Sequence, residues 1–144
     1  EKGVLIAYTS IYGNTKKAAL LLADELTAKG VKNEVFDLAR SDIYEVVGKA
    51  FKYDKVVFAT TTYNTDVFPK MRTFIEYLTA RNFQNRKVAF IENGSWGPMA
   101  TKVMKSLLQD CKNLTVCENN VTILSGVNEQ TESAIKNLAT ELSV

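Results

Sequence analysis

Short apolar runs alternate with amphipathic stretches along the whole chain. The apolar runs have the length of buried strands, and each is followed by a stretch whose apolar residues recur at helical spacing. We expect strands at residues 4–8, 33–38, 55–59 and 88–91, and a fifth strand within residues 114–124. The pattern therefore predicts five strand–helix units, without internal repeats or linkers between them.

The stretches between the strands predict five amphipathic helices. Gly30 is expected to end the first helix, Ser41 to cap the second, and Pro69 and Pro98 to open the third and fourth. The residues expected to face the core, helix by helix, are Ala19, Leu22, Ala23 and Leu26; Ile43, Val46, Val47, Ala50 and Phe51; Phe68, Met71, Phe74, Ile75 and Leu78; Ala100, Val103, Met104 and Leu107; and Ala134, Ile135, Leu138, Ala139 and Leu142.

Strands that are apolar on both faces and joined by helices indicate a parallel sheet covered on both sides. Five units are too few for a closed eight-stranded barrel, so an open, doubly wound α/β sheet is favoured. In such a sheet, ligands bind beyond the carboxyl ends of the strands, where the strand order reverses. With an order of 2-1-3-4-5, the loops after the first, third and fourth strands would meet at one edge.

Those three loops are the most polar of the loops that carry glycine or aromatic residues: TSIYGNT (residues 9–15), TTTYNTD (60–66) and ENGSWGP (92–98). The first offers hydroxyl groups and free backbone N–H groups at a helix start, which suit a phosphate. The other two carry Tyr63 and Trp96, which suit a flat ring. Each loop alone is equally compatible with a polar turn or a lid over the core. Together they predict a site for a planar ring on a phosphorylated tail. Since neither GxxxxGK[ST] nor GxGxxG occurs, nucleoside triphosphates and dinucleotides are disfavoured.

Composition narrows the class of protein. The 144 residues suggest one domain, and a net charge of +2 is too small to indicate a nucleic-acid-binding protein. The absence of histidine argues against an ordinary zinc or non-haem iron site within this sequence.

Cys111 and Cys117 are expected to be free thiols of a cytoplasmic protein. No apolar run is long enough for a membrane span, and no signal peptide opens the sequence. Because the first residue is Glu1, residues 1–144 are compatible with one domain excised from a longer chain.

With these motifs, the chain resembles the flavodoxin family. TSIYGNT is similar to the T/S-x-T-G-x-T phosphate loop of that family, with Tyr12 in place of a small hydroxyl residue. TTTYNTDVFP is similar to the SPTYN…P segment in the flavodoxin domain of flavodiiron proteins (A-type flavoproteins). ENGSWGP and the following MATKVM are similar to the loop and helix after its fourth strand. The resemblance covers nearly the whole chain. It implies a flavodoxin-like three-layer α/β/α fold of the short-chain type, with a five-stranded parallel sheet of order 2-1-3-4-5.

The resemblance implies FMN as the cofactor. It also implies a set of cofactor-binding residues, with no catalytic and no metal-ligating residue. The phosphate would be held by Ser10, Ile11, Tyr12, Gly13, Asn14 and Thr15. The isoalloxazine ring would be bordered on one side by Thr60, Thr61, Thr62, Tyr63 and Asn64, and on the other by Asn93, Gly94, Ser95, Trp96 and Gly97.

The function that the resemblance implies is electron transfer. The chain would be the FMN-binding domain of a flavodiiron O2 or NO reductase and would pass electrons to a di-iron site in a separate domain. It would be an enzyme only as part of that larger oxidoreductase. The expected partner is a redox protein or a covalently linked redox domain (di-iron, rubredoxin or reductase), with no nucleic-acid or membrane partner. Free-standing flavodoxins are usually acidic, whereas this chain is slightly basic.

Three other functions compete with this interpretation. A free-standing short-chain flavodoxin stays open. A flavodoxin-like, FMN-dependent quinone reductase stays open too, although it would need longer loops to build a substrate pocket. A response-regulator receiver domain is disfavoured, because threonines occupy residues 60–62, where its phosphoacceptor aspartate should stand.

Overall fold

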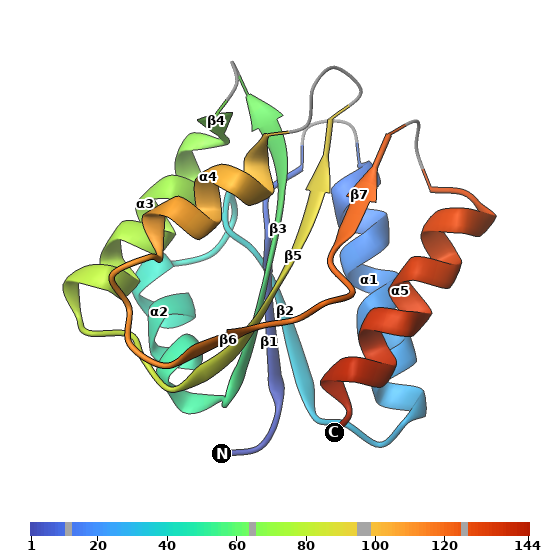
Figure 1. Cartoon of the computed structure of the whole chain (residues 1–144), viewed down its shortest axis with the longest axis horizontal. Coiled ribbons are helices and arrows are strands. Elements are labelled where there is room, and N and C mark those ends of the chain that lie inside the picture. The colour runs from blue at the N-terminus through green and yellow to red at the C-terminus, as the bar shows by residue number, and fades with distance from the viewer. Residues whose placement is uncertain (11–12, 64–65, 95–98, 125–126) are drawn as a thin grey trace.

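The computed structural model describes residues 1–10, 13–63, 66–94, 99–124 and 127–144. In this part of the chain, one sheet is sandwiched between two layers of helices (Figure 1). The strands are β1 (Val4–Tyr8), β2 (Asn33–Asp37), β3 (Lys55–Tyr63), β4 (Asp66–Val67), β5 (Arg86–Asn93), β6 (Leu114–Val116) and β7 (Val121–Ile123). The helices are α1 (Asn14–Ala28), α2 (Ile43–Lys52), α3 (Pro69–Ala80), α4 (Ala100–Leu107) and α5 (Glu129–Leu142). None of these helices is both long and apolar enough to cross a bilayer.

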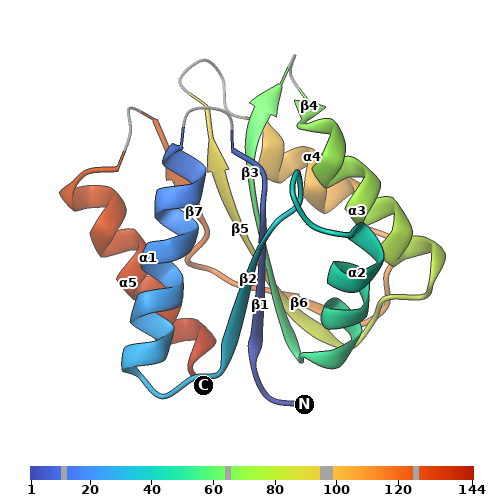
Figure 2. The ribbon, with the colours of Figure 1, turned by 180° about the vertical axis from the view of Figure 1, so that it is seen from behind.

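The main strands are parallel and follow the order β2-β1-β3-β5-β6, with β7 also paired to β5. Since β5 corresponds to the predicted fourth strand, and β6 with β7 to the fifth, the predicted order 2-1-3-4-5 is confirmed. Helices α1 and α5 cover one face of the sheet, and α2, α3 and α4 cover the other (Figure 2). After β1 the chain continues to β2 at one edge of the sheet, and after β3 it continues to β5 on the other side. The switch point, where the strand order reverses, therefore lies between β1 and β3.

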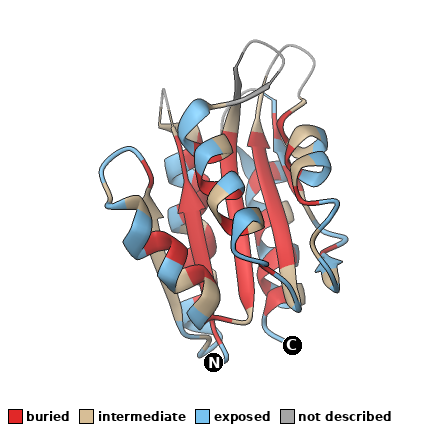
Figure 3. Ribbon diagram, turned by 90° about the vertical axis from the view of Figure 1, so that its left-hand side faces the viewer, coloured by how far each residue is buried: buried red, intermediate tan, exposed pale blue. Residues whose placement is uncertain are grey.

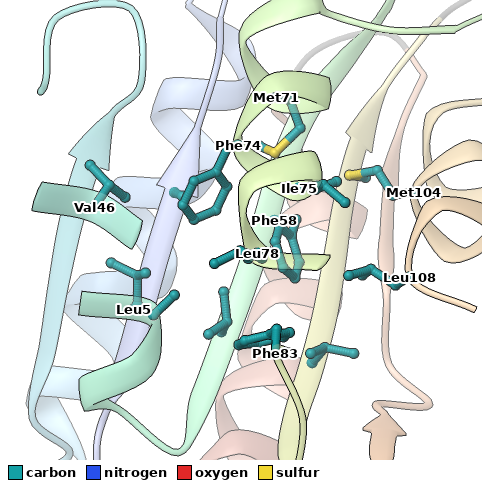
Figure 4. Packing of buried hydrophobic residues seen from close by; sticks show 14 of the residues in the cluster. Leu5, Val46, Phe58, Met71, Phe74, Ile75, Leu78, Phe83, Met104 and Leu108 are labelled. Carbon is teal, nitrogen blue, oxygen red and sulfur yellow. The ribbon is translucent and has the colours of Figure 1, made fainter. Parts of the chain in front are cut away.

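Two hydrophobic clusters hold the layers together, one on each face of the sheet. Successive residues of the central strands alternate between them: Leu5 and Ala7 face α2–α4, while Val4 and Ile6 face α1 and α5. The central strands are buried along most of their length (Figure 3). In the cluster beneath α2–α4, Phe58 stacks on Phe90 with ring centroids 5.7 Å apart, and side chains from α3 and α4 pack around them (Figure 4).

The predicted fifth strand is two short strands rather than one. Between β6 and β7, the N–H of Cys117 still donates to the carbonyl of Val88 at 2.8 Å, and the main chain leaves the ladder at residues 118–120. A side chain takes over there: Asn120 Oδ1 accepts a hydrogen bond from the N–H of Phe90 at 2.8 Å. The amide of Asn120 also donates to the carbonyl of Cys117 at 3.0 Å. A side-chain amide can therefore keep a strand paired across a break in the neighbouring strand. Both cysteines are free thiols, Cys117 buried and Cys111 partly buried.

Two local predictions need correction. The cap of α2 is Asp42, whose Oδ1 accepts a hydrogen bond from the N–H of Tyr44 at 3.0 Å, so the prediction of Ser41 was wrong by one residue. A carboxylate at this position also interacts favourably with the helix dipole. The segment after the third strand is not a simple loop, because β4 pairs antiparallel with the end of β3. Pro98, predicted to open α4, lies outside the described residues.

Candidate cofactor site

Three polar segments meet where β1, β3 and β5 end. The N–H of Thr9 donates to the carbonyl of Ala59 at 2.9 Å, and the hydroxyls of Thr9 and Thr60 are 2.5 Å apart. In α1, the hydroxyl of Thr15 lies 3.3 Å from that of Thr61. Backbone register pairs Thr61 with Asn93 of β5. The described ends of the three segments are therefore held side by side at the switch point, at the upper edge of the sheet in Figure 1.

The start of α1 has the chemistry of an anion cradle. Ser10 Oγ accepts a hydrogen bond from the N–H of Gly13 at 3.0 Å, closing a turn in which Gly13 takes the left-handed conformation, with φ of 90°. Among the described residues no side chain caps this helix, and its first turn contains no acidic residue. The N–H groups of Asn14, Thr15 and Lys16 have no acceptor among the described residues. These donors and the helix dipole fit a phosphate group.

The outer helices begin differently. Asp42 caps α2 and Glu45 lies in its first turn, whereas Asn128 caps α5 and is followed by Glu129 and Glu132. An anion would be repelled by those carboxylates and would find the caps already occupied. In the described part of the chain, helices α3 and α4 also lack a capping side chain and an acidic first turn, but α3 begins with Pro69, which has no N–H, and in α4 the N–H of Thr101 is already bonded to Glu92. Of the three, α1 follows the strand at the switch point and is therefore the best candidate for binding an anion.

A row of polar residues closes the hydrophobic core beneath the site. Phe58 and Phe90 are paired in the sheet, and two residues further along their strands the paired residues are Thr60 and Glu92. At the same level, Thr9 follows β1 and Thr122 lies in β7, so four polar residues form a row across the sheet. Glu92 is only 8% exposed. Its two carboxylate oxygens accept hydrogen bonds from the N–H of Thr101 in α4, at 3.1 Å, and from the hydroxyl of Thr122, at 3.0 Å. A buried carboxylate therefore joins β5, β7 and the first turn of α4.

The predicted site residues fall into three groups. Those with described backbone and side chain converge at this edge: Ser10, Gly13, Asn14, Thr15, Thr60, Thr61, Asn93 and Gly94. For Thr62 and Tyr63 the backbone is described, and it pairs with Val67 and Asp66 of β4. The others lie outside the described residues: Ile11, Tyr12, Asn64, Ser95, Trp96 and Gly97.

Sequence reasoning overlooked the contribution of the last strand to this edge. The N–H of Gly94 donates to the carbonyl of Ile123 at 3.1 Å, and Thr122 holds Glu92. A signal was present, because a strand predicted to end near residue 124 lies next to the fourth strand in the order 2-1-3-4-5. Its last residues therefore had to meet residues 92–94.

Comparisons with known proteins agree with this fold. The family model described as Flavodoxin matches residues 6–137. An anaerobic nitric oxide reductase flavorubredoxin of Escherichia coli O1:K1 is 28% identical over 112 residues, which are 76% of this chain and 23% of that protein. The flavodiiron protein from Giardia intestinalis superposes with a TM-score of 0.90 at 22% identity, over 99% of this chain and 36% of that chain. A flavodoxin from the domain Archaea superposes with a TM-score of 0.84 at 20% identity, over 98% and 96% of the two chains.

The matched region is thus less than a quarter of the length of the curated flavorubredoxin but nearly all of the archaeal flavodoxin. The predicted similarity to both kinds of protein is confirmed. The family match extends over most of the chain, and the uncapped start of α1 at the switch point fits the phosphate of the family's cofactor. The chain belongs to the flavodoxin family, whose cofactor is FMN.

Proposed function

We propose that this chain is an FMN-binding electron-transfer domain. The observation that carries the proposal is the convergence of three polar segments at the switch point. They lie beside a helix start whose N–H groups have no acceptor in the described part of the chain and whose first turn has no carboxylate. Bound FMN supplies the redox chemistry, by accepting and releasing electrons. The protein binds the cofactor, orients it and sets its electrostatic surroundings.

The residues divide between the two parts of the cofactor. Ser10, Gly13, Asn14 and Thr15 would hold the phosphate, because they surround the N–H groups at the start of α1. The segments at 60–63 and 93–94 would border the ring, because they end the two strands beside the switch point. The same roles are assigned to Ile11, Tyr12, Asn64, Ser95, Trp96 and Gly97 on the resemblance alone.

Cofactor titration tests this function. Purified chain, stripped of flavin with acid, should quench the fluorescence of added FMN at one-to-one stoichiometry and bind riboflavin much more weakly, since riboflavin lacks the phosphate. Thr15→Val should weaken FMN binding while leaving riboflavin binding nearly unchanged. A chain that binds FMN and riboflavin equally would contradict the assignment of the phosphate to α1.

We further propose that the electrons pass to a di-iron site in a separate domain of a flavodiiron O2 or NO reductase. The support is the similarity to a flavorubredoxin over 112 residues and to a flavodiiron protein over 99% of this chain. The ligands for such a site would lie outside this sequence, which contains no histidine. Reading the gene upstream of the Glu1 codon tests the proposal, which predicts a preceding domain with histidine and carboxylate ligands.

A free-standing flavodoxin is the second candidate, and the extent of the match to the archaeal flavodoxin favours it: the alignment covers 98% of this chain and 96% of that one. The same gene reading distinguishes the two, because a free-standing flavodoxin requires no preceding metal-binding domain. Either carrier should show almost no steady-state turnover with NAD(P)H and a quinone. Rapid turnover would instead support a quinone reductase.

A further inference from the structure

Lysines occupy the first turns of the three helices that follow the central strands. They are Lys16 and Lys17 in α1, Lys70 in α3 and Lys102 in α4. All four are exposed, and none forms an ion pair with an acidic side chain in the part of the chain that is described. We call these four residues the lysine rim.

The positions of these lysines oppose the helix dipole. The N-terminal end of a helix is partially positive, so cations are unfavourable there and acidic residues are favourable. The same chain follows this rule elsewhere: Glu45 lies in the first turn of α2 and Glu129 in that of α5, while Lys49 lies in the last turn of α2. Helix stability therefore does not explain the lysine rim.

The lysine rim surrounds the candidate cofactor site from both faces of the sheet. Helix α1 lies on one face, and α3 and α4 lie on the other (Figure 2). All three helices begin at the edge where β1, β3 and β5 end (Figure 1). The proposed phosphate position at α1 lies near Lys16 and Lys17 only. Lys70 and Lys102, on the opposite face, are therefore available to another anionic partner.

A notch lined by both apolar and polar side chains adjoins Lys70. A cavity of about 330 Å³ is lined by Leu38, Ser41, Ile43, Pro69, Lys70 and Thr73. Next to Ile43 in the sequence, Tyr44 is 61% exposed and stacks on Tyr77 of α3, with ring centroids 5.6 Å apart. An exposed tyrosine is a typical anchor of protein interfaces, and the surrounding charges guide the encounter of the two proteins.

We propose that the lysine rim is the docking surface for an electron-carrier protein whose redox centre is surrounded by aspartate and glutamate side chains. The inference rests on the proposed electron-transfer function and adds the charge of the partner. Complementary charge steers two carriers together in the orientation that brings their redox centres close. The notch and Tyr44 would then hold the docked complex.

Stopped-flow kinetics of the FMN-loaded chain test this proposal. The probes are an acidic rubredoxin and basic cytochrome c, each reacted with the flavoprotein from low to high ionic strength. In each reaction one electron passes between the carrier's iron and the flavin, so one centre is oxidised as the other is reduced. The test variant is Lys70→Glu/Lys102→Glu. The control is Lys2→Glu/Lys112→Glu, which makes the same change in net charge at exposed positions outside the lysine rim.

We expect the second-order rate constant with rubredoxin to fall as salt is added, and to drop roughly tenfold or more at low salt in the test variant. The control variant should change this rate constant by less than about twofold. With cytochrome c, the rate constant should instead rise as salt is added, and it should be higher in the test variant than in the unmodified chain. Tyr44→Ala should speed dissociation of the rubredoxin complex without altering the salt dependence.

The failures of the two proposals are distinguishable. The docking proposal alone would be overturned if the chain binds FMN tightly but its rate constant with rubredoxin does not depend on salt. It would also be overturned if the test and control variants lower that rate constant equally. A chain that cannot bind FMN would overturn the proposed function, and the docking proposal with it. FMN affinity measured for each variant identifies any loss of rate that comes from lost cofactor.

Discussion

The hydroxyl groups of Thr9 and Thr60 lie 2.5 Å apart, at buried positions where β1 and β3 end. This bond spans the switch point, directly beneath the candidate cofactor site. Thr60→Val keeps the shape of the side chain but leaves the hydroxyl of Thr9 without this partner. We expect a loss of about 1–3 kcal/mol in the free energy of unfolding, because an unsatisfied buried polar group pays its full desolvation cost. Urea denaturation of the apoprotein measures it.

The double variant Thr9→Val/Thr60→Val is the control for that experiment. With both hydroxyls replaced by methyl groups, no polar atom is stranded, so stability should recover most of the loss. Additive losses in the two single variants and the double variant would mean that the two hydroxyls do not act as a pair.

Glu92 provides a second prediction, because it is a buried carboxylate held by two neutral donors next to the proposed ring site. Glu92→Gln preserves the shape and can keep both hydrogen bonds, but it removes the negative charge. The reduction potential of bound FMN should become less negative by on the order of tens of millivolts, since a nearby anion disfavours added electrons. Potentiometric titration of the FMN-loaded protein measures the change.

Thr122→Val is the matched variant for Glu92. It removes one hydrogen bond and leaves the charge in place, so its effect on the potential should be much smaller than that of Glu92→Gln. If the two variants shift the potential equally, the positioning of α4 and β7, rather than the charge, would determine the potential.

The layers, the strand order and the core could be predicted from the sequence because they depend on repeated features. Runs such as residues 56–59 and 88–91 are apolar at every position, as strands covered on both faces must be. Helical spacing places Met71, Phe74, Ile75 and Leu78 on one face of α3, and all four are buried. Each apolar position is a weak indication by itself, but many such positions repeated along the chain together predict the strands, the helices and the core.

The missed features depend on single polar side chains acting at a distance in the sequence. Asn120 pairs with Phe90, thirty residues away, and no local pattern marks Asn120 as a substitute for a strand backbone. The choice of Asp42 over Ser41 as the cap of α2 depends on one residue of register. At the site, the grouping of the loops followed from strand order, whereas the contact between Thr15 and Thr61 needed three-dimensional placement.

The break between β6 and β7 makes a third prediction. Asn120→Ala should remove the only acceptor that the described residues provide for the N–H of Phe90, whose side chain is fully buried. We expect a loss of about 1–3 kcal/mol in the free energy of unfolding and faster hydrogen exchange at the Phe90 amide. Asn120→Asp keeps the acceptor and loses only the donor to Cys117, so it should cost less. Equal exchange rates at Phe90 in all three proteins would show that the bond does not stabilise the ladder.

The fourth prediction concerns pH and the buried Tyr53, whose hydroxyl donates a hydrogen bond to the carboxylate of Glu34. Burial and this bond raise the pKa of Tyr53 from 10.0 to about 12. The stabilisation that depends on neutral Tyr53 is therefore complete below pH 10.0 and is lost as the pH rises through about 12. The hydrogen bond from Tyr53, together with the ion pair between Lys49 Nζ and Glu34 Oε2 at 3.2 Å, lowers the pKa of Glu34. The stabilisation that depends on charged Glu34 is therefore lost as the pH falls through that lowered pKa.

Two variants separate these contributions when unfolding is measured from acid to alkaline pH. Tyr53→Phe should cost roughly 1–3 kcal/mol at neutral pH and should flatten the alkaline decline, because phenylalanine does not titrate. Glu34→Gln keeps an acceptor for Tyr53 and should flatten the acid decline while leaving an alkaline one. If Tyr53→Phe loses stability above pH 10.0 as steeply as the unmodified chain, another group causes the alkaline decline. The Tyr53–Glu34 pair would then have no part in the pH dependence at that end.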